Sequence, residues 1–562
     1  MMLKSIILSA ILSLGISYAH AQDAAQGEDF SLADILNLKV ESASKEAEPL
    51  SEAPVPVTVI TAKMIKDTGV RTLKDALILF VPGMTDVADR NESNFAPRGI
   101  YATAMQKVLI MVNGHRLNSR SYLTSEPDYS ISLHGVERIE ILRGPGSSLY
   151  GNVALSGVVN LIMKKGKDVK GSLAEVAAGS FGAERGRFLT GSSTDDTDLL
   201  IWGQTYKANG EEITIDGSES YMSGKTGTIY VGATKKPEPY DLGVIYKSGK
   251  LSYYLGSRQS SWVEPYAQTV TYNYDLYRRF LGQGPGLGMT FGHLGVKYDT
   301  TEGAWSFQVN PYYDTSTIKL ILAGANGAGT GAYWADRSWG LILQANKTYE
   351  NALGKGSLLI GAQYDGFEVY DSLRGTYTSG NISAISDSKT TPLLQPGGED
   401  ITSFFIQSKQ RLSDKWIVNG GVRYDKKKRK TLADFQKPSP RLAFIYLPNE
   451  AWDFKFSYSE SFVDAPYWYR YNSLPAFGGS EAITPELLNA MQFVASWKGK
   501  TMGNTLTSYI QKGKDILTNR ATAAGTTADP KYINSGVIDS YGFENEFKYF
   551  AKNFDLNWVL TY

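Results

Sequence analysis

The chain has 562 residues, with 57 basic and 57 acidic side chains and no cysteine. Without cysteine there are no disulfides and no thiolate metal sites. The zero formal charge gives no indication of a nucleic-acid partner, and we expect none. Beyond the N-terminal segment no run of about 18 apolar residues occurs, so a membrane protein of this sequence would have to be a β-barrel.

The N-terminal segment, Met1 to Ala21, has the pattern of a secretory signal. Lys4 supplies the positive charge, Ile6 to Ile16 is mostly apolar, and Ala19-His20-Ala21 is a small-x-small cleavage site. The mature chain is then expected to begin at Gln22, and the alternative is a membrane anchor. An exported protein meets little ATP, which disfavours nucleotide chemistry.

Residues 22–50 form an N-terminal extension, and residues 51–168 mix helical and strand patterns. Val55 to Ile60 predicts a strand, and Thr61 is placed to cap a helix after it. Thr72 to Phe80 predicts a second helix. Lys107 to Val112 followed by Asn113-Gly114 predicts a hairpin. We therefore expect a compact α/β domain here.

The glycine-rich stretch Arg143 to Gly151, "RGPGSSLYG", follows a predicted strand, Val136 to Leu142, as a phosphate-binding loop would. It lacks the Gly-Lys-Ser/Thr that opens a helix in such loops. The segment after it, Leu155 to Ile162, predicts another strand instead. We interpret Gly144, Gly146 and Gly151 as permitting a tight turn beside the backbone of a neighbouring barrel wall.

Residues 169–562 alternate apolar and polar side chains in many short segments, among them Trp416 to Tyr424 and Trp452 to Tyr458. Short turns such as Leu412 to Lys415 alternate with long polar loops such as Asp371 to Glu399. Outer-membrane barrels have short periplasmic turns and longer extracellular loops. A soluble β-sandwich has no reason to sort its loops by length in this way.

The alternating segments amount to about seventeen strands. The last, Asp555 to Tyr562, would run outward, whereas bacterial barrels have an even strand number with both ends periplasmic. We therefore expect the chain to stop before the barrel closes. The alternative is that Tyr562 is a true terminal aromatic residue.

The segments "APVPVTVITAKMI", "VPGM", "PRGI", "VLIMVNGHRL" and "VERIEILRGPGSSLYGNVALSGVVNLI" occur in this order. They resemble the plug domain of TonB-dependent outer-membrane receptors, and the resemblance extends over the barrel region. It implies a transmembrane antiparallel β-barrel, of about 22 strands in the family, with the N-terminal α/β plug in its lumen.

The resemblance also implies a lock between plug and barrel, in which Arg98 and Arg143 face acidic residues of the wall. Glu544, in "GFENE", is in the matching place for one, although simple lumen polarity would also explain it. Glu140 and Arg143 suit fixed ion pairs at such an interface. Gln492 stands where the family often has a second Glu, so a lock of four charges is not assured.

The segment Leu38 to Ser44, "LKVESAS", precedes the plug. In the family a short box here binds the inner-membrane energy transducer TonB, which works with ExbB and ExbD. An extended peptide can add a strand to a sheet edge. The candidate box comprises Leu38, Lys39, Val40, Glu41 and Ser42, and the alternative is a disordered linker.

Ligand contacts are expected on the plug apex and the outward loops. The apical candidates are Arg90 and Asn91, within the loop Ala88 to Phe95, with Asn118 to Ser125 as a second loop. The barrel candidates, in the segment Asp464 to Asn472, are Tyr467, Trp468, Tyr469 and Arg470. Packing at the outer rim is the alternative for these aromatics. Lys426 to Lys430, expected in an outward loop, would contact lipopolysaccharide or an anionic substrate, or be merely solvated.

The four histidines show no zinc spacing, and no Gly-x-Ser-x-Gly elbow is present. We expect no enzyme, no metal site and no intrinsic cofactor. The resemblance implies TonB-dependent uptake of a scarce metal chelate, foremost a ferric siderophore, with cobalamin or haem as alternatives. A passive porin and a surface receptor for adhesion or bacteriocins are the other classes considered.

Overall fold

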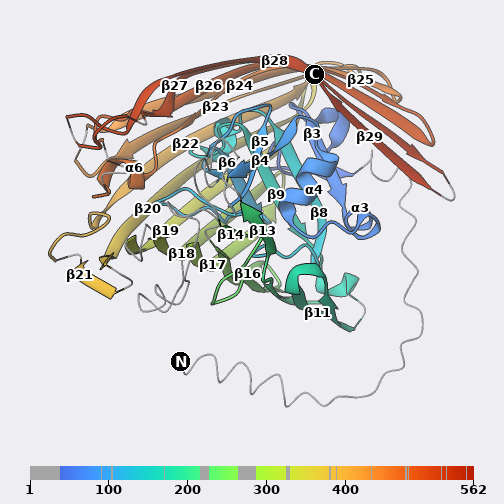
Figure 1. The fold of residues 1–562 in the computed structure, drawn as a ribbon. Coiled ribbons are helices and arrows are strands. Elements are labelled where there is room, and N and C mark those ends of the chain that lie inside the picture. The colour runs from blue at the N-terminus through green and yellow to red at the C-terminus, as the bar shows by residue number, and fades with distance from the viewer. Residues whose placement is uncertain are drawn as a thin grey trace.

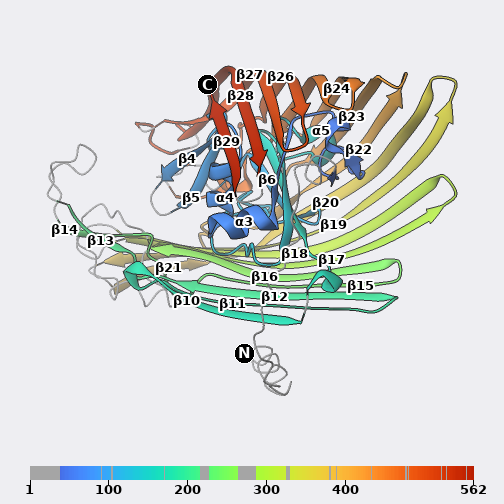
Figure 2. The ribbon, with the colours of Figure 1, turned by 90° about the vertical axis from the view of Figure 1, so that its right-hand side faces the viewer.

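The computed structural model describes residues 38–562 except 90–91, 103–104, 170, 216–226, 264–285, 324–328, 379–380, 388, 432, 475–477, 479, 521, 527 and 552–553. The expected signal segment and most of the N-terminal extension lie outside this part. A large curved sheet, hereafter the wall, wraps around the N-terminal domain, the plug (Figures 1 and 2). No helix in the described ranges is long and apolar enough to cross a membrane.

The two plug helices begin where the sequence predicts, because both are capped locally. The helix α3 (Ala62–Thr68) starts at Thr61, whose hydroxyl accepts a hydrogen bond from the amide of Met64 at 3.3 Å. The helix α4 (Leu73–Phe80) starts with a reciprocal capping box between Thr72 and Asp75. Its buried face packs against the plug sheet in the main apolar core.

The plug sheet has five strands in the order β3 (Val57–Thr61), β8 (Val136–Arg143), β9 (Gly157–Met163), β6 (Val108–Val112) and β7 (His115–Arg116). Strands β6 and β9 pair in parallel, and the other pairs are antiparallel. Asn113 and Gly114, between β6 and β7, both have positive φ angles, 47° and 81°, as a two-residue hairpin requires. The predicted hairpin is confirmed.

Several short elements complete the plug and its flanks. They are β1 (Lys39–Val40), β2 (Glu48–Pro49), η1 (Leu50–Glu52), β4 (Met84–Asp89), β5 (Glu92–Pro97), α5 (Ser147–Tyr150), η3 (Gly166–Asp168) and η4 (Ser180–Gly182).

The wall is one 18-stranded sheet in which strands that follow one another in the chain pair antiparallel. Its strands are β10 (Ser172–Ala178), β11 (Glu184–Ser193), β12 (Thr197–Lys207), β15 (Tyr240–Ser248), β16 (Leu251–Val263), β17 (Gly286–Glu302), β18 (Trp305–Ala323), β19 (Gly329–Asn351), β20 (Gly354–Thr378), β21 (Asn381–Asp387), β22 (Gly397–Arg411), β23 (Trp416–Lys428), β24 (Phe435–Asn449), β25 (Trp452–Val463), β26 (Glu486–Lys498), β27 (Met502–Asn519), β28 (Tyr532–Phe550) and β29 (Asp555–Thr561). A separate hairpin, β13 (Glu211–Ile215) and β14 (Gly227–Val231), follows β12, and the helix α6 (Tyr467–Tyr471) follows β25.

The alternation predicted for the wall strands is present in the structure. In β23, Val422 and Tyr424 are exposed on the outer face, whereas Arg423 and Asp425 are buried on the inner face. The short turn predicted at Leu412 to Lys415 joins β22 to β23. The inner face of the wall is therefore polar and meets the plug, while the outer face is apolar.

The long connections differ from prediction. Much of Asp371 to Glu399, expected as a loop, is strand, because β20 continues to Thr378 and β21 pairs with its outer part. Lys426 to Lys428 likewise belong to β23 rather than to an outward loop. Strand residues that lie outside the membrane can be polar on both faces of the sheet. Their sequence therefore lacks the apolar–polar alternation from which the strands were predicted.

The two ends of the wall strands differ in their connections and contact different parts of the plug. Lys409 and Arg411, beside the short turn after β22, form ion pairs with Glu52, and Lys409 also pairs with Glu48. The N-terminal segment therefore lies at the short-turn end. Helix α6 lies toward the long hairpins (Figure 1).

Candidate functional site: the contacts between plug and wall

One contact between plug and wall is a buried ion-pair group at β28. Arg98 of the plug donates to both carboxylate oxygens of Glu544, from Nε at 2.7 Å and from Nη2 at 3.0 Å. Arg143, at the end of β8, donates from Nη1 to Oε2 of the same carboxylate at 2.7 Å. All three side chains are at most 3% exposed. The structure thus brings together three of the four residues that the sequence assigns to the lock.

Two further wall residues complete this group, which we call the lock. Gln492 accepts from Nη1 of Arg98 at 2.8 Å, and Glu546 pairs with Nη2 of Arg143 at 2.9 Å. Two guanidinium groups therefore meet two carboxylates. Sequence analysis missed Glu546, although it lies two residues after Glu544 and so on the same face of the strand.

Glycines allow the close approach at the lock. A Cβ atom on Gly83 would lie 2.5 Å from a carboxylate oxygen of Glu544, and one on Gly144 would lie 3.0 Å from the amide nitrogen of Gln492. Both glycines have positive φ angles, 76° and 104°, which favour glycine. Arg98 itself has a φ of 51°, and its guanidinium lies 4.1 Å from the ring centroid of Tyr509.

The turn after β8 approaches wall side chains rather than wall backbone. Gly151 lies against Arg423, so that a Cβ atom would be 2.9 Å from the guanidinium. Gly146 lies instead against Val158, within the plug. The glycines of this turn therefore serve packing, as expected, but against different atoms.

Glu140 is not part of the lock, contrary to prediction. It accepts from Nε of Arg138 at 2.9 Å, from the amides of Glu41 and Ser42 at 3.0 Å each, and from the Ser42 hydroxyl at 2.7 Å. Glu140 and Arg143 are three residues apart on β8, and side chains three apart on a strand point to opposite faces. Glu140 holds the N-terminal segment instead.

The candidate TonB box, Leu38 to Ser42, lies against the plug. Within it Lys39–Val40 forms β1 and pairs with β2. Val40 and Ser42 are fully buried, and the hydroxyl of Tyr150 donates to the Ser42 carbonyl at 2.9 Å. This segment is therefore held by backbone pairing and by plug side chains together.

The aromatic candidates Tyr467, Trp468 and Tyr469 form α6 and are buried inside the wall. Trp468 stacks on Trp334 with ring centroids 4.6 Å apart, and its amide donates to the carbonyl of Ser121 at 3.1 Å. Of the two interpretations, packing describes this arrangement. The packing partners, however, include a plug loop, not only the outer rim.

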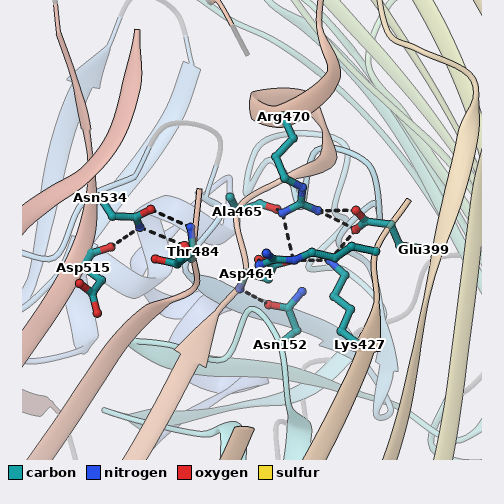
Figure 3. Close-up of polar contacts among 10 residues, drawn as sticks. Asn152, Glu399, Lys427, Asp464, Ala465, Arg470, Thr484, Asp515 and Asn534 are labelled. Carbon is teal, nitrogen blue, oxygen red and sulfur yellow. Dashed lines mark hydrogen bonds and ion pairs between the residues drawn. The ribbon is translucent and has the colours of Figure 1, made fainter. Parts of the chain in front are cut away.

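The Arg470 side chain is 0% exposed, and both of its terminal nitrogens are paired within the wall (Figure 3). It donates to Glu399 at 2.6 Å and to Asp464 at 3.0 Å. Lys427 pairs with the same two carboxylates, which corrects its expected place in an outward loop. The amide of Asp464 donates to Asn152 of the plug at 2.9 Å, so this cluster touches the plug as well.

Two histidines far apart in sequence meet at the opposite edge of the plug sheet. His115 of β7 contacts Asp314 of β18 through Nε2 at 2.8 Å, and His293 of β17 contacts the same oxygen through Nδ1 at 3.0 Å. Their ligand atoms lie within 4.8 Å of one another, a spacing that could hold a metal ion. Arg258 donates to Nε2 of His293 at 3.3 Å, so Nδ1 of this ring carries the hydrogen. This arrangement favours a hydrogen bond from His293 to Asp314 over a metal ion between them.

Family models match both parts of this architecture. The TonB-dependent Receptor Plug Domain matches residues 49–158, and the TonB dependent receptor-like β-barrel matches residues 192–562. The chain belongs to the TonB-dependent receptor family. The receptor is therefore an outer-membrane β-barrel protein with a plug, as the sequence patterns predict.

Curated relatives of the receptor are matched over part of their length. The vitamin B12 transporter BtuB of Vibrio vulnificus is 30% identical over 191 residues, which is 34% of this chain and 30% of the relative. The iron-regulated outer membrane virulence protein of Vibrio cholerae is 29% identical over 222 residues, 37% of this chain and 32% of the relative. The matched stretch thus spans about a third of each relative.

Solved structures resemble the receptor over most of its length. The siderophore receptor PirA from Acinetobacter baumannii superposes with a TM-score of 0.70 at 18% identity, covering 92% of this chain and 81% of that one. The ferric enterobactin receptor of Pseudomonas aeruginosa has a TM-score of 0.67 at 16% identity, covering 91% and 81%. At these identities the likeness concerns the fold.

The remaining predicted ligand residues of the receptor, Arg90 and Asn91, lie outside the described residues. The domain limits at residues 21, 50 and 168 stay predictions.

Proposed function

We propose that the receptor takes up a scarce metal chelate, foremost a ferric siderophore, across the outer membrane with energy supplied through TonB. The observation that carries this proposal is the nature of the plug contacts. Arg98, Arg143 and Glu544 hold the plug through charged groups that water could solvate if the plug moved. A plug meant to stay in place permanently would be better held by apolar packing.

The ligand class is supported by likeness. The structures that resemble the receptor include siderophore receptors, and one relative is named for iron regulation. The buried state of α6 and the two ion pairs of Arg470 disfavour direct contact of these residues with a ligand unless the segment moves. Haem is a further alternative, and a passive porin is disfavoured because the plug occupies the space inside the wall.

Cobalamin is the second candidate, because the relative with 30% identity is a vitamin B12 transporter. We propose that the same transport mechanism would serve either ligand, since the plug contacts involve only protein groups. Lipopolysaccharide remains a proposed neighbour of the exposed wall.

The proposed TonB contact is the segment Leu38 to Ser42. Its β1 strand pairs with only two residues of β2, so little backbone pairing would be lost on release. An extended segment freed at the short-turn end could add to a sheet edge of TonB, which ExbB and ExbD would energise. We infer that this end faces the periplasm.

A titration panel on the full-length receptor tests the ligand. Ferric siderophores, haem and cobalamin would each be added while tryptophan fluorescence is measured. Sub-micromolar binding of one ferric chelate supports the first candidate. Tight binding of cobalamin alone would replace it with the second, and binding of none would overturn uptake of these ligands.

Deleting Leu38 to Ser42 tests energy coupling. We expect ligand affinity to stay unchanged and uptake by whole cells to be lost. Deleting residues 218–222, which precede β14, provides a control of equal length that should leave uptake intact. Normal uptake without Leu38 to Ser42 would contradict the assignment.

A further inference from the structure

A cavity of about 150 Å³ lies between the plug and the wall on the side of β6 and β7. Its plug side comes from β6, β7, α5 and the N-terminal segment, and its wall side comes from β17 to β20, β22 and β23. In the same measure a single water needs about 10–15 Å³, so the cavity has room for a group of several atoms.

The aspartates that line the cavity are already paired with basic groups. Asp365 accepts from Arg120 at 3.0 Å, and Asp425 accepts from Arg423 at 2.9 Å. Asp314, the third, is held by the two histidines described above. These three carboxylates are therefore occupied by partners other than the remaining cations of the cavity. Glu41 also lines the cavity, and within the described residues it forms no ion pair with Lys45 or Arg116.

Lys45 and Arg116 also line the cavity, and neither has a carboxylate within ion-pair distance among the described residues. The Lys45 ammonium lies 4.4 Å from the ring centroid of Phe405 and 5.3 Å from that of Tyr150. Arg116 donates only to two backbone carbonyls, at 3.1 and 3.3 Å. Two positive charges thus face one cavity with neutral partners.

Burial makes these two charges costly. It lowers the pKa of Lys45 to about 7, and the nearby Arg423 guanidinium adds to the effect. Burial likewise lowers the pKa of Arg116 to about 9, with Arg120 contributing. A buried charge is stabilised by a counterion with hydrogen-bonding oxygens. The protein supplies that counterion for Arg120 and Arg423 but not for Lys45 and Arg116.

We propose that this cavity binds a small oxyanion, a phosphate or carboxylate group, through Lys45 and Arg116. Such a group has acceptor oxygens for both cations and is small enough for the space. The proposal concerns binding within the cavity and does not rest on the transport function. The oxyanion could be free in solution or could be an acidic group of the transported ligand.

Lys45 connects the site to the N-terminal segment, because its amide donates to the carbonyl of Glu41 at 2.8 Å. An anion bound to Lys45 would therefore act within three residues of Ser42. If the proposed function holds, occupancy of the cavity would change how firmly the candidate TonB box is retained.

Calorimetric titration of the full-length receptor in detergent with inorganic phosphate tests the site. We expect Lys45→Met and Arg116→Met each to weaken phosphate binding about tenfold, as loss of a charge-assisted hydrogen bond does. Lys297→Met is the matched control, because Lys297 lines the same cavity but pairs with Asp299 at 3.4 Å. Melting temperatures of all three variants would identify any that fail to fold.

Two results would overturn the proposal: absence of phosphate binding to the unaltered receptor, and binding that Lys45→Met leaves unchanged. Soaking crystals with selenate gives a second measurement, and anomalous density between Lys45 and Arg116 would support the site. Density elsewhere only would contradict it.

Ferric citrate distinguishes the two sources of the oxyanion. Competition between ferric citrate and phosphate supports a site for acidic groups of a ligand, and simultaneous binding supports a site for a free anion. These titrations measure anion binding and do not depend on transport. A receptor that fails to take up a ligand could therefore still bind phosphate in the cavity, so the two proposals are tested separately.

Discussion

The plug meets the wall differently at the two edges of its sheet. At the β3 edge, next to β28, the lock joins two arginines to two carboxylates with little exposure. At the β7 edge, next to β17 and β18, the contact includes the hydrogen bond between His115 and Asp314 and lies beside a cavity. Figure 2 shows β28 and β17 on opposite sides of the plug.

The difference lies in how charge is compensated. The lock is neutral in sum and its charged side chains are buried, so removing any one of these charges leaves an opposite charge in a dry surrounding. The cavity side keeps Lys45 and Arg116 without carboxylates and has room for a further group. The lock is thus suited to retention of the plug, and the cavity side is suited to a change of occupancy.

Breaking the lock should have the largest effect. Glu544→Ala leaves Arg98 and Arg143 with reduced compensation, and loss of one partner of a buried pair costs about 3–5 kcal/mol. We expect a lower melting temperature and raised ion conductance in planar bilayers, because the plug is retained less firmly. Glu460→Gln, which removes a partly exposed wall pair with Lys437, is the control. Equal conductance in both variants would show that the lock does not retain the plug.

Breaking the opposite contact should have a smaller effect. His115→Ala removes one hydrogen bond to Asp314, which His293 continues to contact, so the cost is about 1–2 kcal/mol. Hydrogen exchange at β6 and β7 should increase while exchange at β3 stays the same. His134→Ala, another plug histidine without a contact to Asp314, serves as the control. A loss of stability as large as that caused by Glu544→Ala would contradict the distinction between the two edges of the plug sheet.

A third effect, small for each pH unit, concerns the cavity side. Because the pKa of Lys45 falls to about 7 in the folded protein, below its ordinary value of 10.5, the unfolded chain binds more protons between these values. Stability should therefore rise with pH from 7 toward 10, by at most about 1.4 kcal/mol per pH unit. Melting temperatures at pH 7, 8 and 9 should rise less in Lys45→Met. If melting temperature rose equally with pH in Lys45→Met and in the unaltered receptor, the conclusion that Lys45 lacks a counterion would be contradicted.

Bound phosphate should sharpen this pH comparison. It would favour the charged form of Lys45 and so reduce the slope in the unaltered receptor. No such reduction is expected in Lys45→Met, because the titrating group is gone.

Local features of the fold were predictable because nearby residues produce them. Thr61 and Thr72 cap their helices through amides three residues on, and Asn113-Gly114 has the conformations its hairpin requires. The alternation of β23 marks which face meets the lumen. By contrast, the part of β20 that continues to Thr378 does not alternate apolar and polar residues, so the sequence did not predict this part of the strand.

The candidate site was only partly predictable. Arg98, Arg143 and Glu544 were placed together through resemblance, whereas Glu140 was assigned to the wrong partner. Its actual partners are Arg138, two residues away, and the N-terminal segment, where Ser42 is 98 residues away in the chain. Arg470 has the residue type of a ligand contact, yet two buried carboxylates already pair with it.

The sequence by itself determined an antiparallel β-barrel preceded by a compact α/β domain, because strand alternation, turn residues and helix caps act over a few residues; the place of that domain in the lumen was implied by the family resemblance. Only the tertiary structure decided which charges compensate one another. Arg98 and Glu544 are 446 residues apart, and His115 and Asp314 are 199 apart. Such pairs are set by the register of the wall around the plug, which no local pattern encodes.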